Sequence, residues 1–251
     1  MLGIILTYFS FPEILSYQLS NFKKYVKTNY TVFVIDDSPS GLAELKQEGV
    51  RYFKHDNSCV TAPSARHQNA VNFGLKKAQE AGCNTFLVFD NDMIFLTEFN
   101  LPSGSWYLPQ FRGKLEYSWL NLIYLEKIHR FDFKNCSVTG ERSDSGGNYI
   151  GKNKIVSICD HGKVNIENGF MTSYLSEYNE LCKKYNIPVW YDILDVNGCI
   201  VFHFCALSNW KKWGEEFQIN KKRLILKYLA REAGPDKREV SDLSVNMNVS
   251  N

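Results

Sequence analysis

The chain has 251 residues, of which 44% are hydrophobic and 22% charged, a composition typical of a globular protein with one sizeable core. Its formal net charge of +2 gives no general basic character of the kind found in nucleic-acid-binding proteins. Two short basic runs, at 211–212 and 221–223, are interpreted as solvated helix faces. No apolar stretch is long enough to span a bilayer, and residues 1–11 lack the basic start and cleavage site of a signal peptide. We therefore expect a soluble, cytoplasmic protein that neither binds nucleic acid nor crosses a membrane.

The seven cysteines contain no Cys-x-x-Cys spacing and are odd in number. A complete disulfide framework or a structural zinc site is therefore not expected. Small buried side chains in a reducing compartment are the expected role for most of them.

Strands and helices alternate through the first part of the chain. Apolar strands are predicted at 3–9, 31–35, 50–54 and 85–89, and helices at 12–27, 41–48 and 64–81. This alternation is typical of a largely parallel, doubly wound α/β sheet flanked by helices.

The pattern changes after residue 92. Strands are predicted at 93–96, 105–111, 189–193 and 199–204, and helices at 118–128, 172–185 and 215–232. Residues 140–154, rich in Gly, Ser and Asn, indicate a long loop. We expect a single α/β domain over 1–233, followed by a flexible tail at 234–251.

Two acidic groups follow two of the early predicted strands. Asp36-Asp37 comes after the strand at 31–35, and Asp90-Asn91-Asp92 after the strand at 85–89. In open α/β sheets, ligands bind beyond the carboxyl ends of the strands. Two carboxylates at Asp-x-Asp spacing repel each other unless a cation lies between them, and Mg²⁺ or Mn²⁺ takes such oxygen ligands together with substrate phosphates. The alternative is an acidic turn that only caps a strand.

Three segments, in order, resemble the nucleotide-binding half of the GT-A glycosyltransferases. They are Val34–Ser38, Asn72–Ala78 and Phe86–Asp92. The resemblance covers residues 3–96 and implies a single Rossmann-like GT-A domain, with a nucleotide-binding half at 1–96 and an acceptor half at 97–233. It also implies transfer of a sugar from a nucleotide-diphosphate donor, a UDP-sugar rather than a GDP-sugar, to a hydroxyl of a glycan, lipid or protein. The implied cofactor is Mn²⁺ or Mg²⁺.

The resemblance assigns the metal site to three residues. Asp90 and Asp92 are the motif aspartates, with Asp92 the direct ligand and Asp90 facing the ribose or the metal. His203, at the end of the strand predicted at 199–204, completes the site.

The same resemblance assigns the nucleotide contacts. Asp36 or Asp37 accepts hydrogen bonds from uracil or ribose, and Arg66 contacts the diphosphate. The other implied nucleotide-binding residues are Thr7, Tyr8, Phe9, Asn91 and Lys211.

An inverting transferase also needs a carboxylate that removes the proton of the acceptor hydroxyl. Glu167 lies where the resemblance places this base, and Asp160 and Asp192 are competing candidates. Trp190 is a candidate for stacking on a sugar. A retaining transferase would not use a base in this way, so the stereochemistry stays open.

Two other functions remain as alternatives. A nucleotidyltransferase would need a Gly-rich, basic loop after the first strand, where this sequence has residues 7–10, Thr-Tyr-Phe-Ser. A non-catalytic module that only binds a sugar nucleotide is the other alternative.

Overall fold

The computed structural model describes residues 1–8, 11–38, 48–60, 63–101, 106–109, 120–125, 169–196, 199–205 and 213–232. The helices are η1 (Pro12–Ile14), α1 (Leu15–Tyr25), α2 (Pro63–Glu80), α4 (Gly169–Tyr185) and α5 (Glu215–Glu232). The strands are β1 (Leu2–Tyr8), β2 (Tyr30–Asp36), β3 (Val50–Lys54), β4 (Thr85–Phe89), β5 (Met93–Phe95), β6 (Trp106–Pro109), β7 (Leu120–Leu125), β8 (Asp192–Val196) and β9 (Cys199–His203). The predictions of a helix at 41–48, a loop at 140–154 and a tail at 234–251 fall largely or wholly outside the described residues.

The larger sheet confirms the predicted α/β class. Its six strands lie in the order β3-β2-β1-β4-β7-β6. β3, β2, β1 and β4 are parallel, whereas β7 and β6 are antiparallel to their neighbours. The chain first moves outward from β1 to β3 and then returns to place β4 on the other side of β1. The strand order therefore reverses between β1 and β4, the position where doubly wound sheets bind ligands at the carboxyl ends of their strands.

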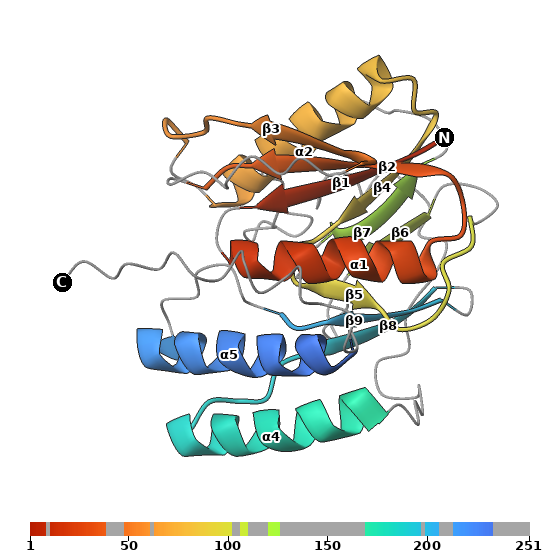
Figure 1. Cartoon of the computed structure of the whole chain (residues 1–251). Helices are drawn as coiled ribbons and strands as arrows, with labels where there is room; N and C mark the ends of the chain where they lie inside the picture. Colours follow the sequence, from red (N-terminus) through yellow and green to blue (C-terminus); the bar gives the residue numbers. More distant parts are fainter. Residues whose placement is uncertain are drawn as a thin grey trace.

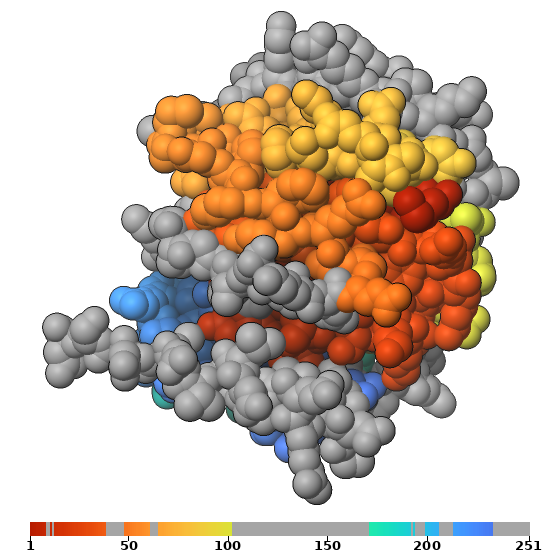
Figure 2. Space-filling model, turned by 45° about the horizontal axis from the view of Figure 1, so that its top comes forward, coloured from red at the N-terminus to blue at the C-terminus, as the bar shows by residue number. Residues whose placement is uncertain are grey.

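The parallel strands β1, β2 and β4 are largely buried on both faces because a helix covers each face, whereas the edge strand β3 is partly exposed. Leu2, Ile4 and Leu6 of β1 belong to the core that includes α1, whereas Ile5 belongs to the core beneath α2. The close approach of α2 to the sheet depends on Gly74, since a Cβ atom there would lie 2.6 Å from Cγ2 of Ile5. Figure 2 shows α2 and residues 48–60, in yellow and orange, forming part of the surface on this side of the molecule.

A second sheet has three antiparallel strands in the order β5-β9-β8. α1 lies between this sheet and the six-stranded sheet, and α5 and α4 lie on its far side (Figure 1). Tyr174 of α4 packs edge-on against Phe202 and Phe204. One hydrophobic core runs from β1 through α1 to α5, so the two parts of the chain are packed together.

Two predictions of secondary structure are wrong. Residues 120–125 form strand β7 and not part of a helix at 118–128, because they pair with β4 on one side and β6 on the other. A short apolar run fits a buried strand and a buried helix equally well, so only its partners decide. The strand predicted at 189–193 also begins later, at Asp192.

The prediction that the basic run at 221–223 forms a solvated helix face is wrong for its first residue. Lys221 is 0% exposed, whereas Lys222 is half-buried. Lys221 occupies the apolar stripe of α5, four residues after Phe217 and four before Ile225, both of which are buried. Here the position of the residue on the helix, and not its charge, decides that its side chain is buried.

Four of the five described cysteines, Cys83, Cys182, Cys199 and Cys205, are buried, as expected, whereas Cys59 is exposed; all five are free thiols. None of the helices within the described ranges has the length and apolar character required to cross a bilayer.

Candidate metal and nucleotide site

The Asp90-Asn91-Asp92 triplet is the turn by which the chain leaves one sheet and enters the other. Asp90 follows β4 of the six-stranded sheet, and Asp92 directly precedes β5 of the three-stranded sheet. β5 pairs with β9 so that Met93 lies opposite His203. The amide of Phe204 also donates to the carbonyl oxygen of Asp92 at 2.9 Å. Backbone pairing therefore brings His203 to the triplet.

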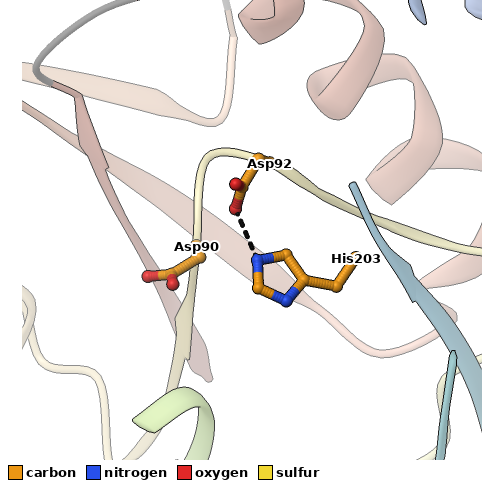
Figure 3. Close-up of side chains that lie close together, drawn as sticks. All are labelled: Asp90, Asp92 and His203. Carbon is orange, nitrogen blue, oxygen red and sulfur yellow. Dashed lines mark ion pairs between the residues drawn. The ribbon is translucent and has the colours of Figure 1, made fainter. Parts of the chain in front are cut away.

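The side chains of Asp90, Asp92 and His203 form a compact cluster. One ligand atom from each lies within 4.8 Å of the others. Oδ1 of Asp92 and Nε2 of His203 are 2.9 Å apart, and these two residues are 5% and 4% exposed. Figure 3 shows Asp92 and His203 facing each other, with the carboxylate of Asp90 turned to the other side of its backbone. The structure thus brings together the three residues predicted as metal ligands.

The donor set fits a divalent cation. Two ligand atoms bound at right angles to one octahedral ion, each about 2.1 Å from it, lie about 3 Å apart. The 2.9 Å between Asp92 and His203 matches this spacing. Two carboxylates with one imidazole suit a first-row ion such as Mn²⁺ better than Mg²⁺, which prefers oxygen ligands.

Burial, the neighbouring His67 and the second carboxylate all act on Asp90. Burial raises the pKa of Asp90, and the charge of Asp92 raises it further, while His67 opposes both effects. Nε2 of His67, on α2, lies 3.2 Å from Oδ1 of Asp90. A cation between the two aspartates would relieve their repulsion.

Gln18 of α1, which was not predicted from the sequence, supports the turn at residues 90–92 through hydrogen bonds to the backbone. Its amide group donates to the carbonyl oxygens of Asp90, at 3.0 Å, and Met93, at 2.8 Å. The hydroxyl of Tyr8 donates to Oε1 of Gln18. The signal in the sequence was a polar residue next to Leu19 on the apolar face of a helix.

Tyr8 was predicted to border the base, but its side chain is 1% exposed and lies in the core. Burial, together with the charge of Asp92, raises its pKa well above the usual value. Its carbonyl oxygen accepts a hydrogen bond from the amide of Asp37 at 2.7 Å. Through Gln18 and this bond, Tyr8 connects the triplet to the second acidic group.

Asp36, at the end of β2, is fully buried and already well supplied with donors. Its Oδ1 accepts hydrogen bonds from the amide and the hydroxyl of Ser38, and its Oδ2 accepts one from the hydroxyl of Tyr52. Nζ of Lys54 lies 3.5 Å from Oδ2. Asp36 therefore holds the turn after β2.

Asp37 differs from Asp36 in the number of hydrogen bonds that its carboxylate accepts. Oδ2 accepts a hydrogen bond from Nε of Arg66 at 3.0 Å, and Nη2 of Arg66 donates to the carbonyl oxygen of Asp37. Oδ1 is buried and has no hydrogen-bond partner within the described ranges. The nearest ring nitrogen, Nδ1 of His55, is 3.7 Å away and is in hydrogen-bond contact with Nδ2 of Asn57. Oδ1 of Asp37 is thus a buried acceptor whose hydrogen-bonding capacity is unused among the described residues.

Some of the other predicted site residues belong to the described part of the chain, and four lie outside it. Thr7 and Asn91 are buried next to the site residues, and the backbone of Asp192 pairs with His203 across β8 and β9. Trp190 packs against Trp213. Phe9, Asp160, Glu167 and Lys211 lie outside the described residues.

Comparison with known proteins adds no family to this picture. No protein-family model matches the chain, and none of the curated proteins searched matches it.

Proposed function

We propose that this protein is a metal-dependent glycosyltransferase that uses a nucleotide-diphosphate sugar as donor. The observation that carries the proposal is the convergence of Asp90, Asp92 and His203 to within 4.8 Å. This cluster lies at the carboxyl end of β4, beside the reversal of strand order in a parallel sheet. The order of the three segments that resemble GT-A enzymes supports the same conclusion.

In the proposed mechanism, Asp90, Asp92 and His203 would hold Mn²⁺, and the ion would supply Lewis-acid neutralisation of the charge on the departing nucleoside diphosphate. The oxygen of the acceptor hydroxyl attacks the anomeric carbon of the sugar, and the bond between that carbon and the diphosphate oxygen breaks. Gln18 fixes the turn that carries the two aspartates, so that these ligands are placed before the donor binds.

Asp37 is the proposed contact to the nucleoside. Its buried Oδ1 can accept a hydrogen bond from an N–H of the base or a hydroxyl of the ribose. Nε of Arg66, whose side chain is 22% exposed, lies 3.0 Å from Oδ2 of this carboxylate and holds it in place. A uracil ring has one N–H on its pairing edge, which matches the one oxygen of Asp37 that has no hydrogen-bond partner among the described residues, so a UDP-sugar is the proposed donor.

For an inverting reaction the base remains one of three carboxylates. Asp192 gains support because its backbone lies directly opposite His203. In this scheme the base accepts the proton of the acceptor hydroxyl as the new glycosidic bond forms. A glycan, lipid or protein hydroxyl is the proposed acceptor.

The proposal is tested by thermal melting with Mn²⁺ and UDP, and then by release of UDP from UDP-sugars. At ligand concentrations about 100 times the Kd, the melting temperature should rise by about 5 °C or more. Asp92→Asn should lose this shift, whereas Asp56→Asn, an exposed acid at the end of β3, should keep it. No shift of the unsubstituted protein with any nucleoside diphosphate and metal would refute the proposal. Binding without turnover of any sugar nucleotide would instead indicate the non-catalytic module.

A further inference from the structure

Lys221 is a cation in the interior that the proposed mechanism does not use. Its side chain is 0% exposed, and its Nζ donates to the carbonyl oxygen of Cys205 at 2.6 Å. Nζ also lies 4.9 Å from the centroid of the Tyr178 ring and 5.6 Å from that of Trp213. A buried ammonium group is costly unless its contacts are well made. Because Lys221 nevertheless occupies the apolar stripe of α5, we expect its ammonium group to have a structural or functional role.

Cys205, the partner of Lys221, has an unusual backbone. Its φ angle is 52°, in the left-handed region that residues with a side chain rarely adopt. Such conformations persist where the surroundings hold them. Because Lys221 binds the carbonyl oxygen of Cys205, it supports the chain in this conformation two residues after His203.

The thiol of Cys205 meets the metal-site imidazole. Its Sγ lies 3.3 Å from Nδ1 of His203, while Nε2 of the same ring lies 2.9 Å from Oδ1 of Asp92. Both ring nitrogens are thus in contact with a side chain, and this fixes the plane of the ring. A thiol can donate or accept a hydrogen bond, so it pairs with Nδ1 in either neutral tautomer. The tautomer that binds a metal through Nε2 carries its proton on Nδ1 and donates it to the outer partner.

We propose that Cys205 and Lys221 are positioning residues of the metal site. Lys221 holds the carbonyl oxygen of Cys205, the thiol of Cys205 holds Nδ1 of His203, and Nε2 of His203 is thereby directed toward Asp92 and the cation. The inference rests on the proposed function, because it assigns the outer contacts of the same three ligands. It adds two residues, one of them on α5, that touch neither metal nor substrate.

The test is the dissociation constant for Mn²⁺ alone, measured by calorimetry and by the electron paramagnetic resonance signal of free Mn²⁺. Loss of an outer partner of a ligating histidine weakens metal binding by about 10- to 100-fold. Cys205→Ala and Lys221→Met should each show a loss of this size, and Cys205→Ser should restore part of the affinity. Lys227 lies on the same helix as Lys221 and forms an exposed ion pair with Glu177 of α4. Lys227→Met should leave the dissociation constant unchanged.

Cys205→Gly separates positioning from folding. Glycine adopts a positive φ without strain, so this variant relieves the backbone while it removes the thiol. We expect it to melt within a few degrees of the unsubstituted protein and still to bind Mn²⁺ about 10-fold more weakly. If folded variants at both positions bind Mn²⁺ as tightly as the unsubstituted protein, this inference is overturned and the proposed function is not.

Nitrogen chemical shifts of His203 provide a measurement that needs no variant. In the protein bound to Zn²⁺, a diamagnetic ion that accepts imidazole ligands, the ring should carry its proton on Nδ1. A proton on Nε2 in that state would overturn the inference even if a variant failed to fold. If the unsubstituted protein binds neither Mn²⁺ nor Mg²⁺, with or without UDP, the inference and the proposed function both fail.

Discussion

Nε2 of Gln18, near the start of α1, donates a hydrogen bond to the carbonyl oxygen of Met93 at 2.8 Å. The same amide group donates to the carbonyl oxygen of Asp90, so one side chain spans the turn that carries both motif aspartates. Neither of these residues lies near Gln18 in sequence. The helix that follows β1 therefore acts as a support for the metal site as well as a cover for the sheet.

Gln18→Met should destabilise the protein. The substitution keeps the length of the side chain but removes the hydrogen-bond partner of the buried Met93 carbonyl oxygen, the part-buried Asp90 carbonyl oxygen and the hydroxyl of Tyr8. Unsatisfied buried groups cost about 1–3 kcal/mol each, and partial relaxation should bring the loss in the free energy of unfolding to about 2–3 kcal/mol. Urea denaturation measures this loss. Gln79→Met, at an exposed position of α2, is the control and should change the value by less than about 0.5 kcal/mol.

Gly74→Ala should also destabilise the protein, although alanine favours a helix more than glycine. The new Cβ would lie 2.6 Å from Cγ2 of Ile5 and 2.9 Å from Cγ1 of Ile35, so α2 would have to move away from the sheet. Overpacking of this kind costs about 1–3 kcal/mol, more than the gain in helix propensity of about 1 kcal/mol. Thermal melting distinguishes this from Lys76→Ala, an exposed site on α2 where little change is expected. An increase in stability of Gly74→Ala would mean that α2 packs less closely than described.

The stability of the protein should depend on pH through Lys221. Burial lowers the pKa of Lys221 from 10.5 to about 8, and Cys205, Asp92 and Cys182 oppose this through their charges. Tyr178 also faces the ammonium group, and burial raises its pKa. Below pH 8 both folded and unfolded chains carry the charge. Between about pH 8 and 10.5 the folded protein gives up a proton that the unfolded chain retains, so the free energy of unfolding rises.

The measurement is the free energy of unfolding of the unsubstituted protein and of Lys221→Met, each at pH 7 and at pH 10. The difference between the two proteins should shift by about 2–3 kcal/mol in favour of the unsubstituted protein at the higher pH. Ionising groups other than Lys221 affect both proteins and cancel to first order. A difference that does not change with pH would show that Lys221 keeps an ordinary pKa.

The catalytic base is tested by three matched substitutions. Asp192→Asn should lower the rate of sugar transfer by about 100-fold or more and keep the thermal shift with Mn²⁺ and UDP, because a base contributes to chemistry and not to donor binding. If Glu167→Gln or Asp160→Asn has this effect instead, that carboxylate is the base. Full activity in all three variants would exclude these carboxylates as the base, and the anomeric configuration of the product, read by proton NMR, would then distinguish a retaining from an inverting reaction.

The sequence by itself determined the parallel part of the sheet and the location of its acidic ends. Runs such as residues 85–89 are apolar throughout because helices cover both faces, and the polar triplet that follows stops the strand. These signals are local in sequence, so they can be recognised without knowing which segments pack against the strand. The same is true of α5, whose boundaries at Glu215 and Glu232 agree with the prediction.

Tertiary structure decided everything that depends on a partner distant in sequence. β7 is a strand because β4 and β6 flank it, Lys221 is buried because α5 packs over the small sheet, and Tyr8 faces the core because α1 covers it. The 2.9 Å contact between Asp92 and His203 likewise exists because β5 pairs with β9. Residue type and spacing indicate which groups can bind a cation, but only the pairing of strands decides which of them meet.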